Sequence, residues 1–375
     1  MATLKDVARA AGVSVMSVSN VLNGTGRYSA GMSERVLRAV EEVGYAGPDP
    51  AAASLRRGRT GTLGVVLPTA LENAFGEPDT ARFLQGVART FQRRATTMTL
   101  LALPPSAGPL RREDAEPRER VARGPLAALE RAVIDAVLLY SVEEDHPGLD
   151  VVARRALPVL AVDSPGPEVG AERFGGAWAG FLTVDDHGGA LAAARHLVER
   201  GHRRAAVLVD RLLLQPRLGP VPWDRALATT SAIVRARLAG YRDAWTGAGL
   251  PLDDLLVVEC GTHDPAAGRA AVEELLTAPG GAPDAVLALS DSLAHGAVEG
   301  ALAAGLRVPE DLAVVGYDDS GDAARAPVPL TTVHQPSGLK GETAAALLLD
   351  HAAAAPGEAP PVRQLPTRLV VRAST

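Results

Sequence analysis

The side chains of this sequence that could do chemistry are short polar groups near the start and charged groups further along. Short, uncharged side chains follow Ser14 on the outer face of one predicted helix. They are Val15, Met16, Ser17, Ser19, Asn20 and Asn23. Side chains of this kind can approach the base edges and phosphates of DNA closely. A plain three-helix bundle with a solvated polar face has the same pattern, so the pattern alone leaves both interpretations open.

Sequence motifs for catalysis are absent. The chain has no Walker loop, no Gly-x-Ser-x-Gly elbow and no His-Glu-x-x-His. Asp185-Asp186-His187 could suggest a metal site, but Asp185 is better placed as a helix cap. The single cysteine, Cys260, excludes an intramolecular disulfide and a cysteine-based zinc site. We therefore expect no enzyme activity, no metal and no cofactor.

The charge of the chain is unevenly distributed. Its 375 residues carry a net charge of -6. Residues 1–60 hold eight Lys or Arg and five Asp or Glu, a balance of +3 that leaves -9 for the remainder. A basic head on an acidic body suits a protein that offers its N-terminus to a polyanion. The length predicts two or three domains, and no signal peptide or membrane-spanning stretch is recognisable, so we expect a cytoplasmic protein.

Three short helices are predicted within residues 1–46. Thr3-Leu4-Lys5-Asp6 fits a capped helix start, and Gly12 can end that helix in the left-handed conformation. Ser14 suits the N-cap of a second helix. Two helices joined by such a turn form a helix-turn-helix. A third helix is expected over residues 33–43. Its predicted buried stripe consists of Val36, Leu37, Val40 and Val43.

Short runs rich in Val and Leu alternate with helical stretches after residue 61. The runs lie at 62–68, 97–104, 135–141, 158–163, 205–210, 254–259, 284–290 and 311–318. Continuous apolar runs separated by amphipathic helices indicate parallel sheets that are buried on both faces. Eight such units are too many for one compact sheet, so we predict two similar α/β lobes.

The N-terminal helices resemble the DNA-binding head of the LacI/GalR family of transcriptional regulators. The similar stretches are 3–8, 11–14, 18–23 and 44–45. The resemblance implies a homodimer that places its heads on a pseudo-palindromic operator, with Thr3, Ser14 and the polar face of the second helix at the DNA. Asn20 stands where the family usually has Arg, and Met32-Ser33 stands where Thr-Arg is usual. These departures leave the operator sequence open.

Residues 47–60 resemble the hinge of the same family. In that family the hinge helices of two subunits fold together on DNA and press a Leu into the minor groove, which kinks the duplex. Leu55 matches that Leu, and Arg56 follows it and can reach phosphates. The composition alone would equally suit a flexible linker.

Residues 61–375 resemble the two-lobed, periplasmic-binding-protein-like sensor of this family. The similar stretches lie at 185–204, 290–309, 315–319 and 329–335. The resemblance implies parallel sheets flanked by helices, three chain crossings between the lobes, and a ligand cleft. The expected first lobe covers about 61–162 plus 336–353, and the second covers about 163–335 plus 354–372.

The resemblance also implies a small-molecule effector, a sugar or related metabolite, bound between the lobes. Arg237 matches the family's effector-binding Arg, and Asp318 matches its acidic ligand residue. A structural salt bridge between the two is the alternative. The other candidate effector-binding residues are Phe75, His263, Ser290, Asp291 and Gln335. Two segments, 104–125 and 211–232, are longer than usual, and Trp223 in the second could cover a ligand or pack on its own lobe.

We therefore predict a DNA-binding transcriptional regulator, a repressor, under allosteric control by a small molecule. Three alternatives remain at this stage. They are a solute-binding protein with a vestigial head, an enzyme on the same fold, and a regulator whose effector pocket has degenerated. We do not expect the protein to bind a membrane. The effector, the sign of its effect, the target genes and the choice between dimer and tetramer stay open.

Overall fold

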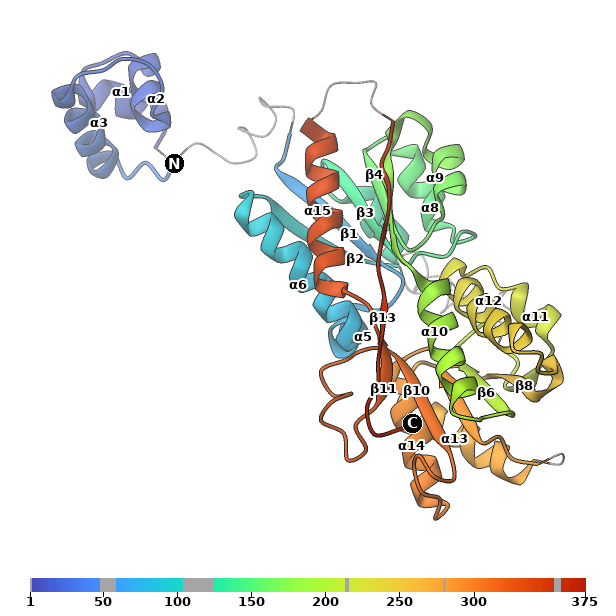
Figure 1. The fold of residues 1–375 in the computed structure, drawn as a ribbon. Coiled ribbons are helices and arrows are strands. Elements are labelled where there is room, and N and C mark those ends of the chain that lie inside the picture. Colours follow the sequence, from blue (N-terminus) through green and yellow to red (C-terminus); the bar gives the residue numbers. More distant parts are fainter. Residues whose placement is uncertain (1, 48–58, 104–123, 213–215, 279–280, 354–358) are drawn as a thin grey trace. The chain divides into compact units, whose positions relative to one another are not determined.

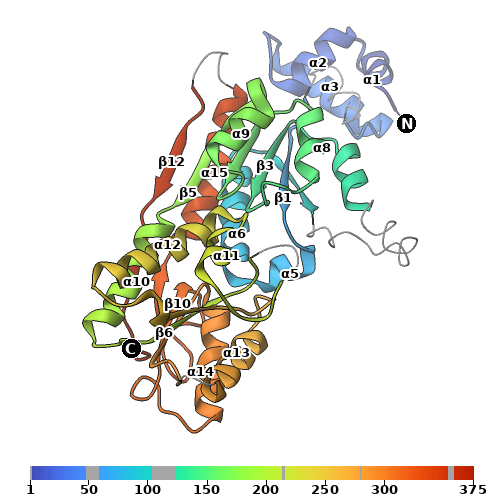
Figure 2. The ribbon, with the colours of Figure 1, turned by 90° about the vertical axis from the view of Figure 1, so that its right-hand side faces the viewer.

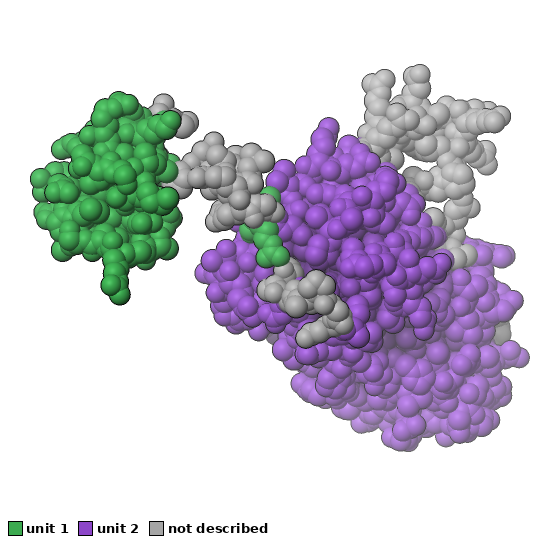
Figure 3. Space-filling view, turned by 90° about the horizontal axis from the view of Figure 1, so that it is seen from above, with its two compact units in different colours: residues 1–61 green, residues 62–375 purple. Residues whose placement is uncertain are grey.

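The computed structural model divides the chain into two compact units, residues 1–61 and 62–375 (Figure 3). It describes residues 2–47, 59–103, 124–212, 216–278, 281–353 and 359–375. In these ranges no helix is long and apolar enough to cross a membrane. Leu55, Arg56 and most of the 104–125 segment lie outside the described residues.

The described part of the first unit contains three helices, α1 (Leu4–Ala11), α2 (Val15–Asn23) and α3 (Ala30–Val43). Thr3 caps α1 and forms a reciprocal capping box with Asp6. Gly12 ends α1 at a φ of 65°, a left-handed conformation that costs a glycine little. The Ser14 hydroxyl caps α2 by accepting the Ser17 N–H at 3.0 Å. The predicted helix-turn-helix is thus present, because each boundary has the residue that its backbone requires.

The predicted buried stripe of α3 needs two corrections. The helix begins at Ala30 after the Ser29 cap, three residues earlier than expected. Leu37 is 51% exposed, whereas Ala39 is buried at 2%. Ala39 lies three residues after Val36 and therefore on the same helix face, while Leu37 is only one residue on and points elsewhere.

The second unit contains two sheets, each covered by helices on both faces (Figures 1 and 2). The first sheet is entirely parallel. Its order is β12 (Val362–Leu365), β5 (Trp178–Val184), β4 (Val159–Val162), β3 (Ala136–Tyr140), β1 (Thr62–Leu67) and β2 (Thr97–Ala102). Helices α6 (Pro78–Arg93) and α15 (Ser337–Ala353) pack together over one core cluster, and α8 (Gly148–Arg154) and α9 (Pro167–Phe174) border the other.

The second sheet has the order β13 (Arg368–Val370), β11 (Thr331–His334), β10 (Ala313–Asp318), β9 (Ala285–Ala288), β6 (Ala205–Val209), β8 (Leu255–Glu259) and β7 (Gly219–Val221). Only its outermost pairs, β13 with β11 and β7 with β8, are antiparallel. Helices α10 (Asp186–Glu199) and α12 (Ala232–Gly247) cover one face. Helices α13 (Pro265–Thr277) and α14 (Asp291–Ala303) cover the other.

All eight apolar runs predicted from the sequence form strands, namely β1, β2, β3, β4, β6, β8, β9 and β10. The predicted lobe boundaries need correction. Strand β5 pairs with β4, and β12 pairs with β5, so residues 178–184 and 362–365 belong to the first lobe and not to the second. The chain crosses between the sheets after β5, after β11 and after β12, which gives the three expected crossings.

Candidate functional site

A cavity of about 510 Å³ lies between the two lobes, at the carboxyl ends of parallel strands. Tyr140 and Asp163 border it at the ends of β3 and β4 in the first lobe. Asp210 and Asp318 border it at the ends of β6 and β10 in the second. A volume of this order suits a small organic ligand, and this edge of parallel sheets is where α/β folds bind ligands.

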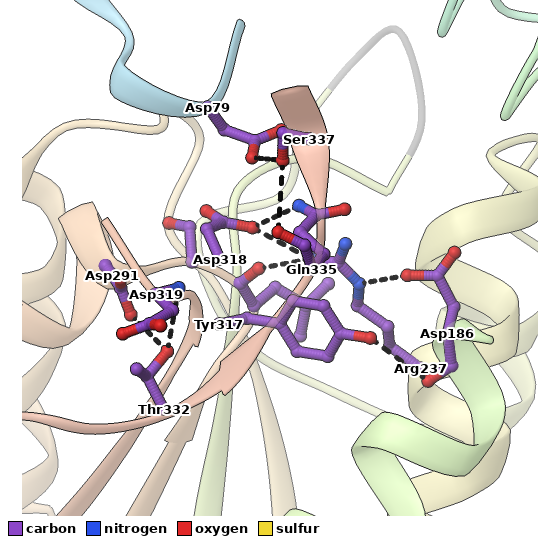
Figure 4. Close-up of polar contacts among 12 residues, drawn as sticks. Asp79, Asp186, Arg237, Asp291, Tyr317, Asp318, Asp319, Thr332, Gln335 and Ser337 are labelled. Atoms are coloured by element: carbon purple, nitrogen blue, oxygen red, sulfur yellow. Dashed lines mark hydrogen bonds and ion pairs between the residues drawn. The ribbon is translucent and has the colours of Figure 1, made fainter. Parts of the chain in front are cut away.

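Arg237, on α12, is the central cation of the second-lobe wall. Its Nε donates to Asp186 Oδ1 at 2.8 Å (Figure 4). Its Nη1 donates to the Leu289 carbonyl at 2.6 Å. The guanidinium lies 3.5 Å from the centroid of the Tyr317 ring. Burial acts to lower the pKa of Arg237, but the charges of Asp186, Tyr317 and Asp318 and the hydrogen bond to Asp186 together outweigh it, and the net shift is upward. The group therefore stays charged.

Asp318 faces the cavity in an unusual backbone conformation, with a φ of 108°. Its Oδ1 accepts a hydrogen bond from Gln335 Nε2 at 2.6 Å and lies 3.9 Å from Arg237 Nη1. Burial, and then the charge of Asp79, raise the pKa of Asp318 well above its usual range. Asp186, at 2.8 Å, is thus a closer carboxylate partner of Arg237 than Asp318, at 3.9 Å. Asp186 was not among the predicted effector-binding residues.

A buried ion pair anchors the first-lobe side. Lys340 Nζ, at the start of α15, donates to Asp163 Oδ2 at 2.6 Å, and their side chains are 2% and 3% exposed. Lys340 Nζ also donates to Gln335 Oε1 at 3.3 Å. Nearby, Asp79 accepts hydrogen bonds from the hydroxyls of Tyr140, at 3.1 Å, and Ser337.

Polar contacts link the lobes at the edge of the cavity. His263 Nε2 lies 3.1 Å from Glu77 Oε1 and belongs to the second lobe, whereas Glu77 precedes α6 in the first. Arg211 Nη2 of the second lobe donates to Glu143 Oε1 of the first at 2.9 Å. These two contacts connect the lobes directly at the edge of the cavity.

Four of the seven predicted effector-binding residues line the cavity, and three do not. Arg237, His263, Asp318 and Gln335 are in the lining. Phe75, on α5 (Leu71–Gly76), is 61% exposed and outside it. Ser290 and Asp291 also lie outside it, because both are committed to the fold. The Ser290 hydroxyl caps α14, and Asp291 accepts hydrogen bonds from the Ser320 N–H and the Thr332 hydroxyl, both at 2.6 Å.

Trp223 packs on its own lobe. Its indole Nε1 donates to the Leu255 carbonyl at 2.8 Å, and its ring lies against the second-lobe core. The described part of the 211–232 segment forms β7 and α11 (Trp223–Leu227). Of the two roles considered for Trp223, the structure supports packing, since the indole is outside the cavity lining.

The predicted DNA-facing residues of the head are accessible. Met16 is 70% exposed and Val15 is 41% exposed, both at the start of α2. Ser14 and Asn23 are exposed, and Ser17, Ser19 and Asn20 are half-buried. Recognition helices contact base edges with their N-terminal residues, so this surface is suitably placed. Thr3 and Ser14 also serve as caps, so their hydroxyls are already engaged.

Comparisons with known proteins agree with this architecture. Residues 3–47 match the family described as bacterial regulatory proteins, lacI family, and residues 194–375 match the periplasmic binding protein-like domain. The chain belongs to the LacI family, and it is a DNA-binding transcriptional regulator. CelR, an HTH-type transcriptional regulator of Thermobifida fusca, is 36% identical over 99% of this chain and 98% of its own length.

Two further relatives are informative. The ribose operon repressor of Escherichia coli strain K12 is 32% identical, over 93% of this chain and 92% of the repressor. A solved structure described as the transcriptional regulator CelR–cellobiose complex is 32% identical, covers 100% of both chains and superposes with a TM-score of 0.66. These relatives are regulators and not enzymes.

Proposed function

We propose that this protein is a repressor that binds a pseudo-palindromic operator as a homodimer and is controlled by a neutral or cationic polyhydroxylated metabolite in its interlobe cleft. The observation that carries the proposal is the cavity itself. It is lined by buried polar side chains from both lobes, and the same chain bears a DNA-binding head.

The cleft gives the ligand a means of control. A molecule that contacts Arg237 and Asp318 in one lobe and Asp163 in the other stabilises whichever lobe angle best satisfies those contacts. By linkage, it changes DNA affinity only as far as it prefers one of the two states. The expected transmitter is the 47–60 hinge, with Leu55 as the minor-groove wedge and Arg56 at the phosphates.

A sugar-like effector is supported by the relatives and by the chemistry of the lining. The solved CelR structure is a complex with cellobiose, and another relative is named a ribose operon repressor. Carboxylates accept hydrogen bonds from ligand hydroxyls, and the cavity offers several. A cytoplasmic location follows if the protein acts on the chromosome.

The first test is a selection of duplexes bound by the purified full-length protein, from random sequence and from its own genome, at about 150 mM salt. The expected product is a pseudo-palindrome with half-sites one helical turn apart and a flexible central step. Recovery of no specific sequence contradicts the proposal. Operator binding that no small molecule alters instead supports the ligand-independent regulator.

Two variants then separate the DNA surface from the cleft. Asn20→Ala removes an amide that can pair with adenine, so it should relax selectivity at one base position by about 1–3 kcal/mol. Leu37→Ala, an exposed side chain on α3, is the matched control. Arg237→Lys keeps a cation opposite Asp186 but loses the forked donor geometry. It should weaken the ligand response while operator affinity stays unchanged.

A further inference from the structure

The interlobe cavity contains more negative than positive charge. Among its described lining residues, seven are carboxylates and three are Lys or Arg. A cavity with this balance disfavours phosphorylated or acidic ligands, because like charges repel strongly where water is scarce. The ion pairs within the cavity show which carboxylates account for the excess negative charge.

Each lining cation already has a carboxylate of its own. Lys340 pairs with Asp163 at 2.6 Å, Arg237 with Asp186 at 2.8 Å and Arg211 with Glu143 at 2.9 Å. Glu77 and Asp210 both flank His263, at 3.1 Å and 3.8 Å. Two lining carboxylates remain, Asp79 and Asp318.

Among the described residues, the hydrogen-bond donors to these two carboxylates are neutral groups. Within the described residues Asp79 has no ion pair, and its partners are the Tyr140 and Ser337 hydroxyls. Asp318 accepts from the Gln335 amide, and its contact with Arg237 is long, at 3.9 Å. The two belong to one polar network, because the Ser337 hydroxyl that donates to Asp79 lies 3.4 Å from the Gln335 carbonyl, and Gln335 donates to Asp318. The charge of Asp79 also contributes to raising the pKa of Asp318. Among the described side chains, Asp79 therefore lacks an ion pair, and Asp318 has only the long contact with Arg237, which is already paired with Asp186.

A second, independent feature also calls for a ligand. Ser164 lines the cavity beside Asp163 and is only 4% exposed. Its hydroxyl has no hydrogen-bond partner among the described residues. A buried hydroxyl without a partner is costly, so a polar ligand atom at this place would satisfy it.

We infer that the effector is a hydroxylated molecule carrying a protonated amine, such as an amino sugar, whose ammonium group binds between Asp79 and Asp318. The inference rests on the proposed function, because it specifies the ligand of the same cleft. The ammonium group donates hydrogen bonds to both carboxylates, and a ligand hydroxyl partners Ser164. Asp79 acts as the residue that selects the amine.

The position of the two carboxylates couples binding to the lobe angle. Asp79 belongs to α6 in the first lobe, and Asp318 ends β10 in the second (Figure 4). A cation that binds both carboxylates would therefore bridge the two lobes. The ligand thus contributes the charge that joins the two lobes at this place.

The test compares amino sugars with their neutral parents by calorimetry on the full-length protein at pH 7. The probes are glucosamine and glucose, galactosamine and galactose, and mannosamine and mannose. We expect at least one amino sugar to bind about tenfold or more tightly than its parent, as a charged hydrogen bond predicts. Asp79→Asn should abolish the difference, and Asp253→Asn, an exposed surface carboxylate, should preserve it. Asp318→Asn is the second variant, in case Asp79→Asn does not fold.

Neutral parents that bind as tightly as the amino sugars overturn the inference, as does a panel in which no amino sugar binds. Operator binding is measured on the same preparations. A neutral sugar that releases the operator while amino sugars have no effect retains the proposed function and removes the inference. If amino sugars bind but the protein selects no specific duplex, the inference about the ligand is retained and the proposed function is removed.

Discussion

Replacing Lys340 with methionine tests the buried ion pair that anchors the first-lobe side of the cleft. The side chain is 2% exposed, and its Nζ lies 2.6 Å from Asp163 Oδ2. Methionine fills a similar volume without a charge, so the variant leaves the Asp163 carboxylate buried with the Thr183 hydroxyl, at 3.1 Å, as its remaining donor. Removing one partner of a buried pair costs about 3–5 kcal/mol of unfolding free energy.

For a unit of this size, that loss lowers the melting temperature of the sensor by roughly 5–8 °C. Differential scanning calorimetry measures it, and the only other lysine, Lys5, provides the control. Lys5→Met should leave the sensor transition unchanged, because Lys5 lies in the separate head. The double variant Asp163→Asn with Lys340→Met removes both charges and should recover at least half of the loss. A Lys340→Met sensor that melts within about 1 °C of wild type, or a double variant no better than the single one, refutes the reasoning.

Three more predictions concern the second lobe. Asp318 has a pKa raised well above its usual value of 3.8, so the folded protein takes up its proton more readily than the unfolded chain does, and stability is lost as pH rises from about 4. Asp318→Asn should therefore raise the melting temperature of the ligand-free protein more at pH 7 than at pH 4, and an equal effect at both contradicts this assignment. Trp223→Phe removes the hydrogen bond to the Leu255 carbonyl and should cost about 1 kcal/mol in urea unfolding without changing ligand affinity; a large loss of affinity would return Trp223 to the site. Asp291→Ala leaves two buried donors unpaired and should cost about 2–4 kcal/mol, detectable as a lower melting temperature, whereas a change confined to ligand binding would make it a ligand residue.

The repeating parts of the fold were predictable from sequence because they depend on local patterns. Eight strands consist of Val- and Leu-rich runs, and the head helices carry caps at Thr3 and Ser14. Strand β5 was missed because only two of its seven residues, Leu182 and Val184, are Val or Leu, and because it contains Gly180. That glycine has a φ of 134°, and a Cβ there would lie 2.6 Å from the Pro361 carbonyl oxygen. Glycine is therefore required at position 180 because of Pro361, which directly precedes β12 and lies far along the chain.

The site was only partly predictable for the same physical reason. Arg237 and Asp318 were found through resemblance, but the partners that define their chemistry come from distant segments. Asp163 and Lys340 are separated by 177 positions and meet only because α15 returns to the first lobe. One signal was available, since Lys340 is one of two lysines in an arginine-rich chain. Ser290 was assigned to the site because the sequence does not distinguish a serine that caps a helix from a serine that binds a ligand.

The three crossings also determine the order in which this protein can form during synthesis. The first sheet takes its outermost strand, β12, from residues 362–365, and α15 of the same lobe from residues 337–353. The sheet is therefore incomplete until nearly the whole chain has left the ribosome, while the separate head, residues 1–61, has been free to fold since early in translation. For most of its synthesis a nascent chain thus carries a folded DNA-binding head and an unfinished sensor, and both lobes gain their last strands almost together.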